Sequence, residues 1–151
     1  MIRSMFCAAV LTVTMLGQAP SQLKYDPQAD PNTGLKAAVA RASREHRNIL
    51  MDVGGEWCSW CHRMDKFISD HAELAAVLER NYVVLKVNFS LENENKKFLS
   101  KYPKVEGYPH LFVLDATGKL LVSKDTGDLE EGKSYNLDRF REFLQQYQVS
   151  K

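Results

Sequence analysis

The 151-residue sequence has few cysteines and no excess of charge of either sign. It contains three cysteines, and its 20 basic and 19 acidic residues give a formal net charge of +1 at pH 7. A disulfide-stapled scaffold would need several cysteine pairs, and nucleic-acid binding would need a strongly positive surface. The sequence also has no glycine-rich phosphate loop and no His-Glu-x-x-His zinc motif. Its composition argues against these classes and fits one ordinary globular domain.

The amino terminus carries an apolar run that is too short for an ordinary membrane span. Residues 5–16 are apolar apart from two threonines and follow the positively charged Arg3. Gly17 and Ala19 are small residues of the kind that a signal peptidase reads. We therefore expect residues 1–19 to be an export signal, with an uncleaved anchor as the alternative, and the mature protein to be periplasmic or otherwise extracytoplasmic. Residues 20–32 are expected to be a linker or lead-in, and residues 33–151 one domain.

Hydrophobic periodicity predicts an α/β domain. Apolar runs indicate strands, and helical spacing indicates helices, in the following segments: strands at residues 49–53, 82–87, 111–114 and 120–123, and helices at residues 35–46, 58–69, 70–80, 91–102 and after Asn136. Helical crossovers imply that the first two strands are parallel, and the turn at residues 115–119 adds an antiparallel hairpin. We expect a mixed central β-sheet of about four strands with helices on both faces.

Two of these helices have recognisable capping residues. Asp70, with Glu73 three residues later, forms a capping-box pattern for the helix at residues 70–80. Ser90 is placed to cap the helix at residues 91–102, and Leu91 is expected on the inner face of that helix.

The pair Cys58 and Cys61 is the main candidate for chemistry, because it directly follows the buried strand and its glycines. Two thiols three residues apart can close a small disulfide if the first of them opens a helix. The positive end of the helix dipole then favours the thiolate of that first cysteine. If the export signal is removed with Cys7, these are the two cysteines that remain.

The spacing of Cys58 and Cys61 is also compatible with other kinds of site. A Cys-x-x-Cys can be a structural disulfide or half of a zinc site, although the remaining histidines that could complete such a site are scattered, at His46, His62, His71 and His110. The same residues followed by His62 also match the Cys-x-x-Cys-His pattern of c-type haem attachment. A haem-binding electron carrier is therefore an alternative function.

The pattern resembles the thioredoxin family over residues 33–149. Three features carry the resemblance: the Trp57-Cys58-Ser59-Trp60-Cys61 motif after a strand, Asp52 six residues before the first cysteine, and Gly107-Tyr108-Pro109-His110 at the start of a strand. The resemblance implies the thioredoxin fold, a buried acid behind the cysteines and a cis-proline that faces the disulfide. Ser59-Trp60 differs from the Gly-Pro of cytosolic thioredoxins and looks more like the exported thioredoxin-like proteins.

The implied activity is that of a thiol-disulfide oxidoreductase. Cys58 is the expected nucleophile, and Cys61 is expected to resolve the mixed disulfide. Burial should raise the pKa of Asp52, which could then take a proton from Cys61. No cofactor is expected for this reaction. A non-catalytic binding module on the same fold is a further alternative.

Residues around the cysteines are expected to bind substrate. Trp57 and Trp60 could form a hydrophobic docking surface, with core packing as the alternative, chiefly for Trp57. Tyr108, Pro109 and His110 would line the same groove, where an extended chain could pair with the backbone.

The last expectations concern pKa tuning and partners. His62 lies four residues after Cys58, so a protonated imidazole could stabilise the thiolate, unless the ring faces solvent without effect. We expect protein partners that carry disulfides or thiols, an electron donor at the membrane, no nucleic acid, and a monomer. The reductase direction is favoured because two cysteines remain and no dimerisation segment is visible.

Overall fold

The structure is a computed structural model that describes residues 24–149. The expected export signal at residues 1–19 lies outside the described residues. The elements follow one another in this order: α1 Pro31–Glu45, β1 Asn48–Gly54, α2 Ser59–Asp70, α3 Ala72–Asn81, β2 Tyr82–Asn88, α4 Lys96–Leu99, β3 His110–Leu114, β4 Leu120–Asp125, the 3₁₀ helix η1 Thr126–Leu129, β5 Glu130–Glu131, β6 Ser134–Tyr135 and α5 Leu137–Gln146. No helix within this part of the chain is long and apolar enough to cross a membrane.

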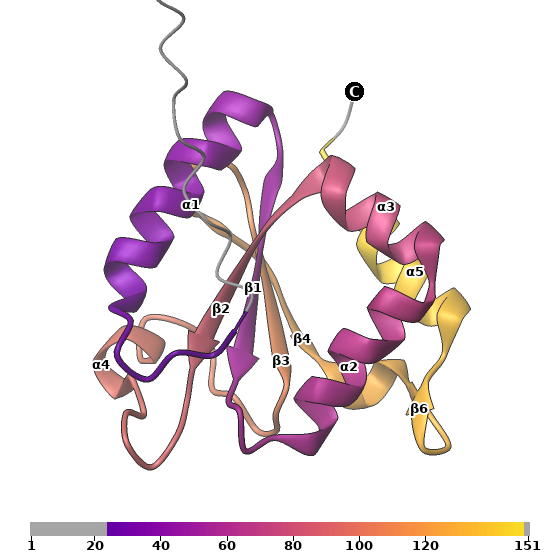
Figure 1. Cartoon of the computed structure of the whole chain (residues 1–151). Helices are drawn as coiled ribbons and strands as arrows, with labels where there is room; N and C mark the ends of the chain where they lie inside the picture. The colour runs from indigo at the N-terminus through magenta and orange to yellow at the C-terminus, as the bar shows by residue number, and fades with distance from the viewer. Residues whose placement is uncertain (1–23, 150–151) are drawn as a thin grey trace, which may run out of the picture.

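The central sheet has four strands in the order β2-β1-β3-β4. Strands β1 and β2 are parallel, whereas β3 is antiparallel to β1 and β4 is antiparallel to β3. Figure 1 shows α1 and α4 on one side of this sheet and α2, α3 and α5 on the other, and each group packs on its own buried cluster. The predicted α/β class, with a mixed four-stranded sheet between helices, is confirmed.

Strand β1 lies in the middle of the sheet and carries the site. All seven of its residues are buried, which agrees with its nearly continuous apolar sequence. Its alternate side chains point to opposite faces, so Leu50 and Asp52 point toward α2, whereas Met51 and Val53 pack with α1 and α4. The carboxyl end of β1 therefore places Asp52 on the face on which the helix with the cysteines lies.

The expected lead-in at residues 20–32 is partly built into the domain. Helix α1 begins at Pro31, earlier than the predicted start at residue 35, because Asp30 caps it by accepting the Asn32 and Thr33 amides. Within the same segment Tyr25 is only 2% exposed. The described part of the lead-in thus packs against the fold and does not behave as a separate linker.

The predicted helix at residues 91–102 is mostly wrong. Only α4, Lys96–Leu99, is helical, and Leu91, expected on the inner face, is fully exposed. The Asn88 side chain donates to the Ser90 hydroxyl at 3.0 Å and to the Asn93 carbonyl at 2.9 Å. Such side-chain bonds hold the segment in a turn and compete with a helix.

The predicted cap at Asp70 is also wrong. Asp70 is the last residue of α2, where its carboxylate accepts from the Lys66 ammonium one turn earlier at 2.7 Å. Helix α3 begins after His71, whose side chain makes no capping hydrogen bond. The i,i+4 ion pair therefore stands where the sequence suggested a capping box.

Candidate active site

Cys58 and Cys61 form a disulfide at the amino terminus of α2, with an S–S distance of 2.12 Å. Cys58 is the N-cap residue, and its Sγ accepts the Cys61 amide at 3.0 Å. Cys58 is 4% exposed and Cys61 is fully buried. In the reduced form the same amide and the helix dipole would stabilise a thiolate at Cys58.

Gly54 allows the end of β1 to approach the disulfide closely. A Cβ atom at this position would lie 2.5 Å from the Cys61 Sγ and 3.0 Å from the Tyr25 ring. Atoms do not approach that closely without displacement, so any side chain here would push the redox pair or the tyrosine out of place.

Asp52 is buried behind the disulfide and has two polar partners. The Tyr25 hydroxyl donates to its Oδ1 at 2.7 Å, and the Lys86 ammonium lies 3.4 Å from its Oδ2. Burial raises the pKa of Asp52 to about 6, although the Lys86 charge and the Tyr25 hydrogen bond lower it. A carboxyl group with this pKa can exchange a proton near neutral pH.

Lys86 links the buried carboxylate to the surface. Its ammonium donates to both oxygens of Asp65 at 2.7 and 2.6 Å and lies 4.2 Å from the centre of the Tyr25 ring. The Lys86 side chain is 6% exposed, whereas that of Asp65 is 42% exposed. A cavity of about 300 Å³ has Asp52, Lys86 and Asp65 in its lining. The three charged groups thus form a polar path from the region behind the disulfide to solvent.

Sequence reasoning missed three members of this cluster. Lys86 could have been found, because it interrupts a buried strand between Leu85 and Val87 and a buried lysine needs a partner. Asp65 lies in a helix that is rich in polar residues, and Tyr25 lies in a polar, proline-containing segment. Only the tertiary structure brings these two residues to Asp52.

The two tryptophans differ in exposure, and core packing, the alternative chiefly for Trp57, applies instead to Trp60. Trp57 is 59% exposed, and its indole N–H donates to the Phe89 carbonyl at 2.6 Å. Trp60 is half-buried, packs edge-on against Tyr135 and lies beneath the Arg63 guanidinium. The hydrogen bond from the indole to the Phe89 carbonyl holds the Trp57 ring at the surface, so Trp57 is the more accessible of the two tryptophans.

Tyr108 lies beside the cysteine pair and is followed by Pro109. The peptide bond between them is cis. The Tyr108 ring stacks on Phe89 at 4.6 Å, meets the Trp57 ring edge-on at 5.7 Å, and packs against the cluster of Tyr25 and the two cysteines. The three aromatic rings form a continuous surface next to the disulfide.

His110 does not share this surface. Its side chain is 5% exposed, its Nε2 lies 2.8 Å from the Ser123 hydroxyl, and its ring contacts Phe112. As residues 110 and 112 share a face of β3, His110 points toward the layer of α1 and α4, away from α2. The expectation that His110 lines the groove conflicts with this alternation.

His62 faces the loop that precedes the cysteines. Its Nε2 lies 2.7 Å from the Glu56 carbonyl oxygen and 3.6 Å from the Glu56 carboxylate. The imidazole is half-exposed. The hydrogen bond to the Glu56 carbonyl connects the ring to the backbone just before Trp57. Among residues 24–149, no group of three or more His, Cys, Asp and Glu side chains is placed to hold a metal ion.

Comparison with known proteins agrees with this geometry. A family model described as thioredoxin-like matches residues 30–116, more than half of the chain. The chain belongs to the thioredoxin-like family. The predicted family and fold are thereby confirmed.

Bacterial disulfide oxidoreductases are among the similar proteins. The chain is 29% identical over 94 residues to the disulfide bond reductase DsbH of Chlamydia pneumoniae, and the match spans 56% of each protein, so the chain covers little more than half of that relative. A structure of a disulphide isomerase from Xylella fastidiosa Temecula1 superposes with a TM-score of 0.69 at 25% identity, over 81% of this chain and 94% of that one. The oxidised carboxy-terminal domain of Neisseria meningitidis DsbD has the same fold, with a TM-score of 0.57 at 20% identity over 78% of this chain and 96% of that domain.

Proposed function

We propose that this protein is a thiol-disulfide oxidoreductase that acts on extracytoplasmic proteins through Cys58 and Cys61, in the reductase direction. One observation carries the proposal: a disulfide capping a helix lies in front of a buried carboxyl group whose pKa is raised to about 6. The similarity to a disulfide bond reductase and a disulphide isomerase supports the same class of reaction.

The reaction consists of two thiol-disulfide exchanges. In the reduced chain the Cys58 thiolate attacks one sulfur of a substrate disulfide, and the other substrate sulfur leaves as a thiolate and takes a proton. Cys61 then loses its proton and attacks the Cys58 Sγ, which releases the first substrate sulfur as a thiolate. Two electrons pass to the substrate, and the chain ends with the disulfide between Cys58 and Cys61.

Asp52 is the proposed proton acceptor for Cys61. The fully buried Cys61 has little access to solvent, so a base inside the protein is needed for its ionisation. Lys86 and Asp65 would let the proton leave toward solvent through the polar path. Regeneration of the two thiols requires a dithiol donor, which for an exported protein we place at the membrane.

The residues that surround the disulfide would hold the substrate. Trp57 and Tyr108 supply aromatic surface near the cysteines, and an extended substrate segment would lie across it, next to the cis bond of Pro109. Haem attachment is less compatible with the site, because the Cys58 and Cys61 sulfurs would both have to be accessible and their residues are 4% and 0% exposed. We propose the extracytoplasmic location from the amino-terminal sequence pattern.

The test is stoichiometric exchange with a protein disulfide. The reduced protein should reduce about one substrate disulfide per chain and accumulate the Cys58–Cys61 disulfide, measured by thiol alkylation and mass spectrometry. Equilibration with glutathione then decides the direction, because the reduction potential is about −270 mV for reducing thioredoxins and about −120 mV for strong oxidants of this fold. A chain that exchanges with neither disulfides nor dithiols would be a binding module, and the proposal would fail.

A further inference from the structure

A groove of about 780 Å³ adjoins the cysteine pair on the side of the loop that follows β2. Its lining includes Tyr25, Trp57, Phe89 and Leu91. Tyr25 also packs directly against Cys58 and Cys61. Glu56 and Trp57, the two residues before Cys58, line the groove as well, so a chain that lies in it would pass close to the cysteine pair.

Two large apolar side chains in the lining of this groove are exposed to solvent. Leu91 is fully exposed, and Trp57 is 59% exposed. Exposed large apolar side chains that gather beside a cavity are typical of a protein-binding surface.

The exposed leucine is held in position by hydrogen bonds of the loop. The Ser90 amide donates to the Asn93 carbonyl at 3.1 Å, which closes a turn with Leu91 and Glu92 at its tip. The Asn93 side chain in turn donates to the Pro27 carbonyl at 2.8 Å. A turn tied in this way presents its tip at low entropic cost to binding.

The charged side chains that line the groove are acidic. Glu56, Glu92 and Glu94 lie in its lining. Glu94 is neutralised by the Lys96 ammonium at 2.7 Å, whereas Glu92 makes no ion pair with any residue between 24 and 149. Glu56 stands two residues before Cys58, and its carboxylate accepts the Tyr25 amide at 3.1 Å. Negative charge thus lies next to both the apolar rim and the disulfide.

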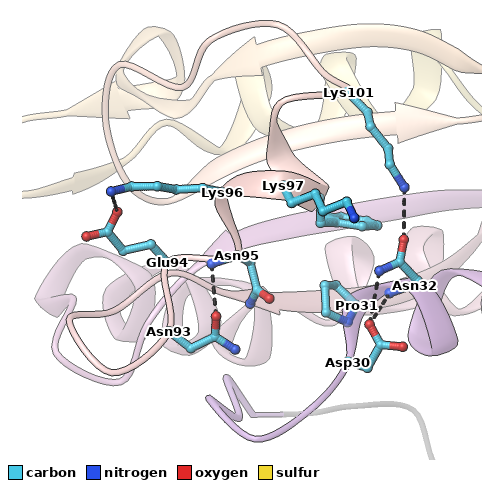
Figure 2. A pocket seen from close by; sticks show the side chains of 10 residues that line it. Asp30, Pro31, Asn32, Asn93, Glu94, Asn95, Lys96, Lys97 and Lys101 are labelled. Carbon is cyan, nitrogen blue, oxygen red and sulfur yellow. Dashed lines mark hydrogen bonds and ion pairs between the residues drawn. The ribbon is translucent and has the colours of Figure 1, made fainter.

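Lysines are placed on the other side of the same loop. Figure 2 shows the pocket between α4 and the start of α1, where Lys96 reaches Glu94 and Lys101 donates to the Asn32 side chain at 2.9 Å. Lys97 projects into this second pocket as well (Figure 2). The loop therefore separates an acidic, apolar groove near the disulfide from a second pocket that has three lysines in its lining.

We propose that the groove binds the segment of a substrate protein that flanks its cysteine, and that it prefers segments with an apolar side chain next to lysine or arginine. This inference rests on the proposed function, since it names the substrate class of the same disulfide. The apolar side chain packs against Leu91 and Trp57. The cationic neighbour lies close to Glu92 and Glu56, whose negative charge also speeds the encounter.

The test uses three synthetic peptides and one small disulfide. Each peptide carries one cysteine in a mixed disulfide with 2-mercaptoethanol, preceded by leucine between lysines, leucine between glutamates, or serine between lysines. The small disulfide is 2-hydroxyethyl disulfide, which is neutral. The rate constants for reaction with the reduced full-length protein are measured at low and high salt.

The leucine–lysine peptide should react about tenfold faster than the leucine–glutamate peptide at low salt, and the difference should shrink at high salt. The serine–lysine peptide should react several-fold more slowly than the leucine–lysine peptide. Glu92→Gln and Leu91→Ser should each lower the ratio of the leucine–lysine peptide rate to the small-disulfide rate. The matched control is Lys97→Gln, which changes a charge in the second pocket and should leave peptide selectivity unchanged.

Equal rates for the lysine and glutamate peptides at low salt would overturn the proposal. This result is also expected if a second copy of the chain, or its own amino-terminal segment, covers the groove. Selectivity that survives in both Glu92→Gln and Leu91→Ser would overturn it as well. If neither the peptides nor 2-hydroxyethyl disulfide react, the proposed function itself fails, and this inference fails with it.

Discussion

The Tyr25 hydroxyl donates a 2.7 Å hydrogen bond to the Oδ1 of Asp52, although 27 positions separate the two residues. Burial, and then the Asp52 charge, raise the pKa of Tyr25 well above its usual range, so the hydroxyl remains a donor. The same ring packs against Cys58 and Cys61. Tyr25, which lies in the segment before α1, thus contacts both the disulfide and Asp52, the proposed proton acceptor.

Tyr25→Phe should shift the pH dependence of disulfide exchange upward. The substitution keeps the ring but removes a hydrogen bond to the Asp52 carboxylate, so the pKa of Asp52 should rise. A bond to a charged group contributes about 1.5–3 kcal/mol, which corresponds to an upward shift of about one to two pH units. The midpoint of the pH–rate profile for mixed-disulfide resolution measures this shift.

The control for this variant is Tyr102→Phe. Tyr102 is a half-buried tyrosine that packs on Phe98 and Phe112, in the other core layer. Its substitution should leave the pH profile in place. A profile that moves equally in both variants would mean that the Tyr25 hydroxyl has no specific effect on Asp52.

Asp52→Asn should slow the resolution step and stabilise the fold at neutral pH. The pKa of Asp52 in the folded protein, about 6, is higher than an unfolded aspartate's value of about 3.9. Between these two pH values the folded state therefore binds more protons than the unfolded state. The stability that Asp52 contributes is fully present below the unfolded pKa and is lost as the pH rises through the folded pKa. The asparagine variant avoids that loss, while Lys86 keeps Asp65 as its partner.

The expected gain for Asp52→Asn is about 1–3 kcal/mol at pH 7.5 and close to none near pH 4. Urea unfolding at the two pH values measures it. Asp138→Asn, at a largely exposed carboxylate of α5, is the matched control and should show no such pH-dependent gain. If Asp52→Asn destabilises the protein at both pH values, the carboxylate is structural rather than a poised base.

The parts of the site that sequence predicted are those fixed by local spacing. Cys58 and Cys61 are three residues apart at a helix start, and Asp52 alternates with core residues on the preceding strand, so a short stretch of sequence places all three. Tyr25 and Asp65 are brought to Asp52 by tertiary packing, and no local pattern marks them. The sheet was predictable because apolar runs define its strands.

The errors arose where polar side chains bind the backbone. Asn88 and Asn93 hold the loop after β2 in a turn, so the apolar spacing that suggested a helix there has no core to face. For Trp57 the sequence left core packing open as the alternative to a docking surface, and the bond from its indole to the Phe89 carbonyl keeps the ring at the surface. A hydrophobicity pattern does not contain either interaction.

Gly54→Ala should displace the redox pair. The added Cβ would meet the Cys61 Sγ at 2.5 Å and the Tyr25 ring at 3.0 Å, so overpacking should lower the free energy of unfolding by about 1–3 kcal/mol. Gly107→Ala is the matched control, because a Cβ there has no atom within 4 Å among those described. Urea unfolding and exchange rates should be altered in the first variant and close to those of the unmodified protein in the second.

Cys61→Ala should accumulate a mixed disulfide between Cys58 and a substrate. Cys58 keeps its place at the helix amino terminus in this variant and can still attack, but nothing within the chain then resolves the product. Cys58→Ala should accumulate far less, because Cys61 is fully buried and lies behind the first turn of α2. Incubation of each variant with a peptide disulfide, followed by acid quenching and intact mass measurement, compares them directly. More adduct on Cys58→Ala than on Cys61→Ala would reverse the two roles and remove Asp52 from its proposed position beside the resolving thiol.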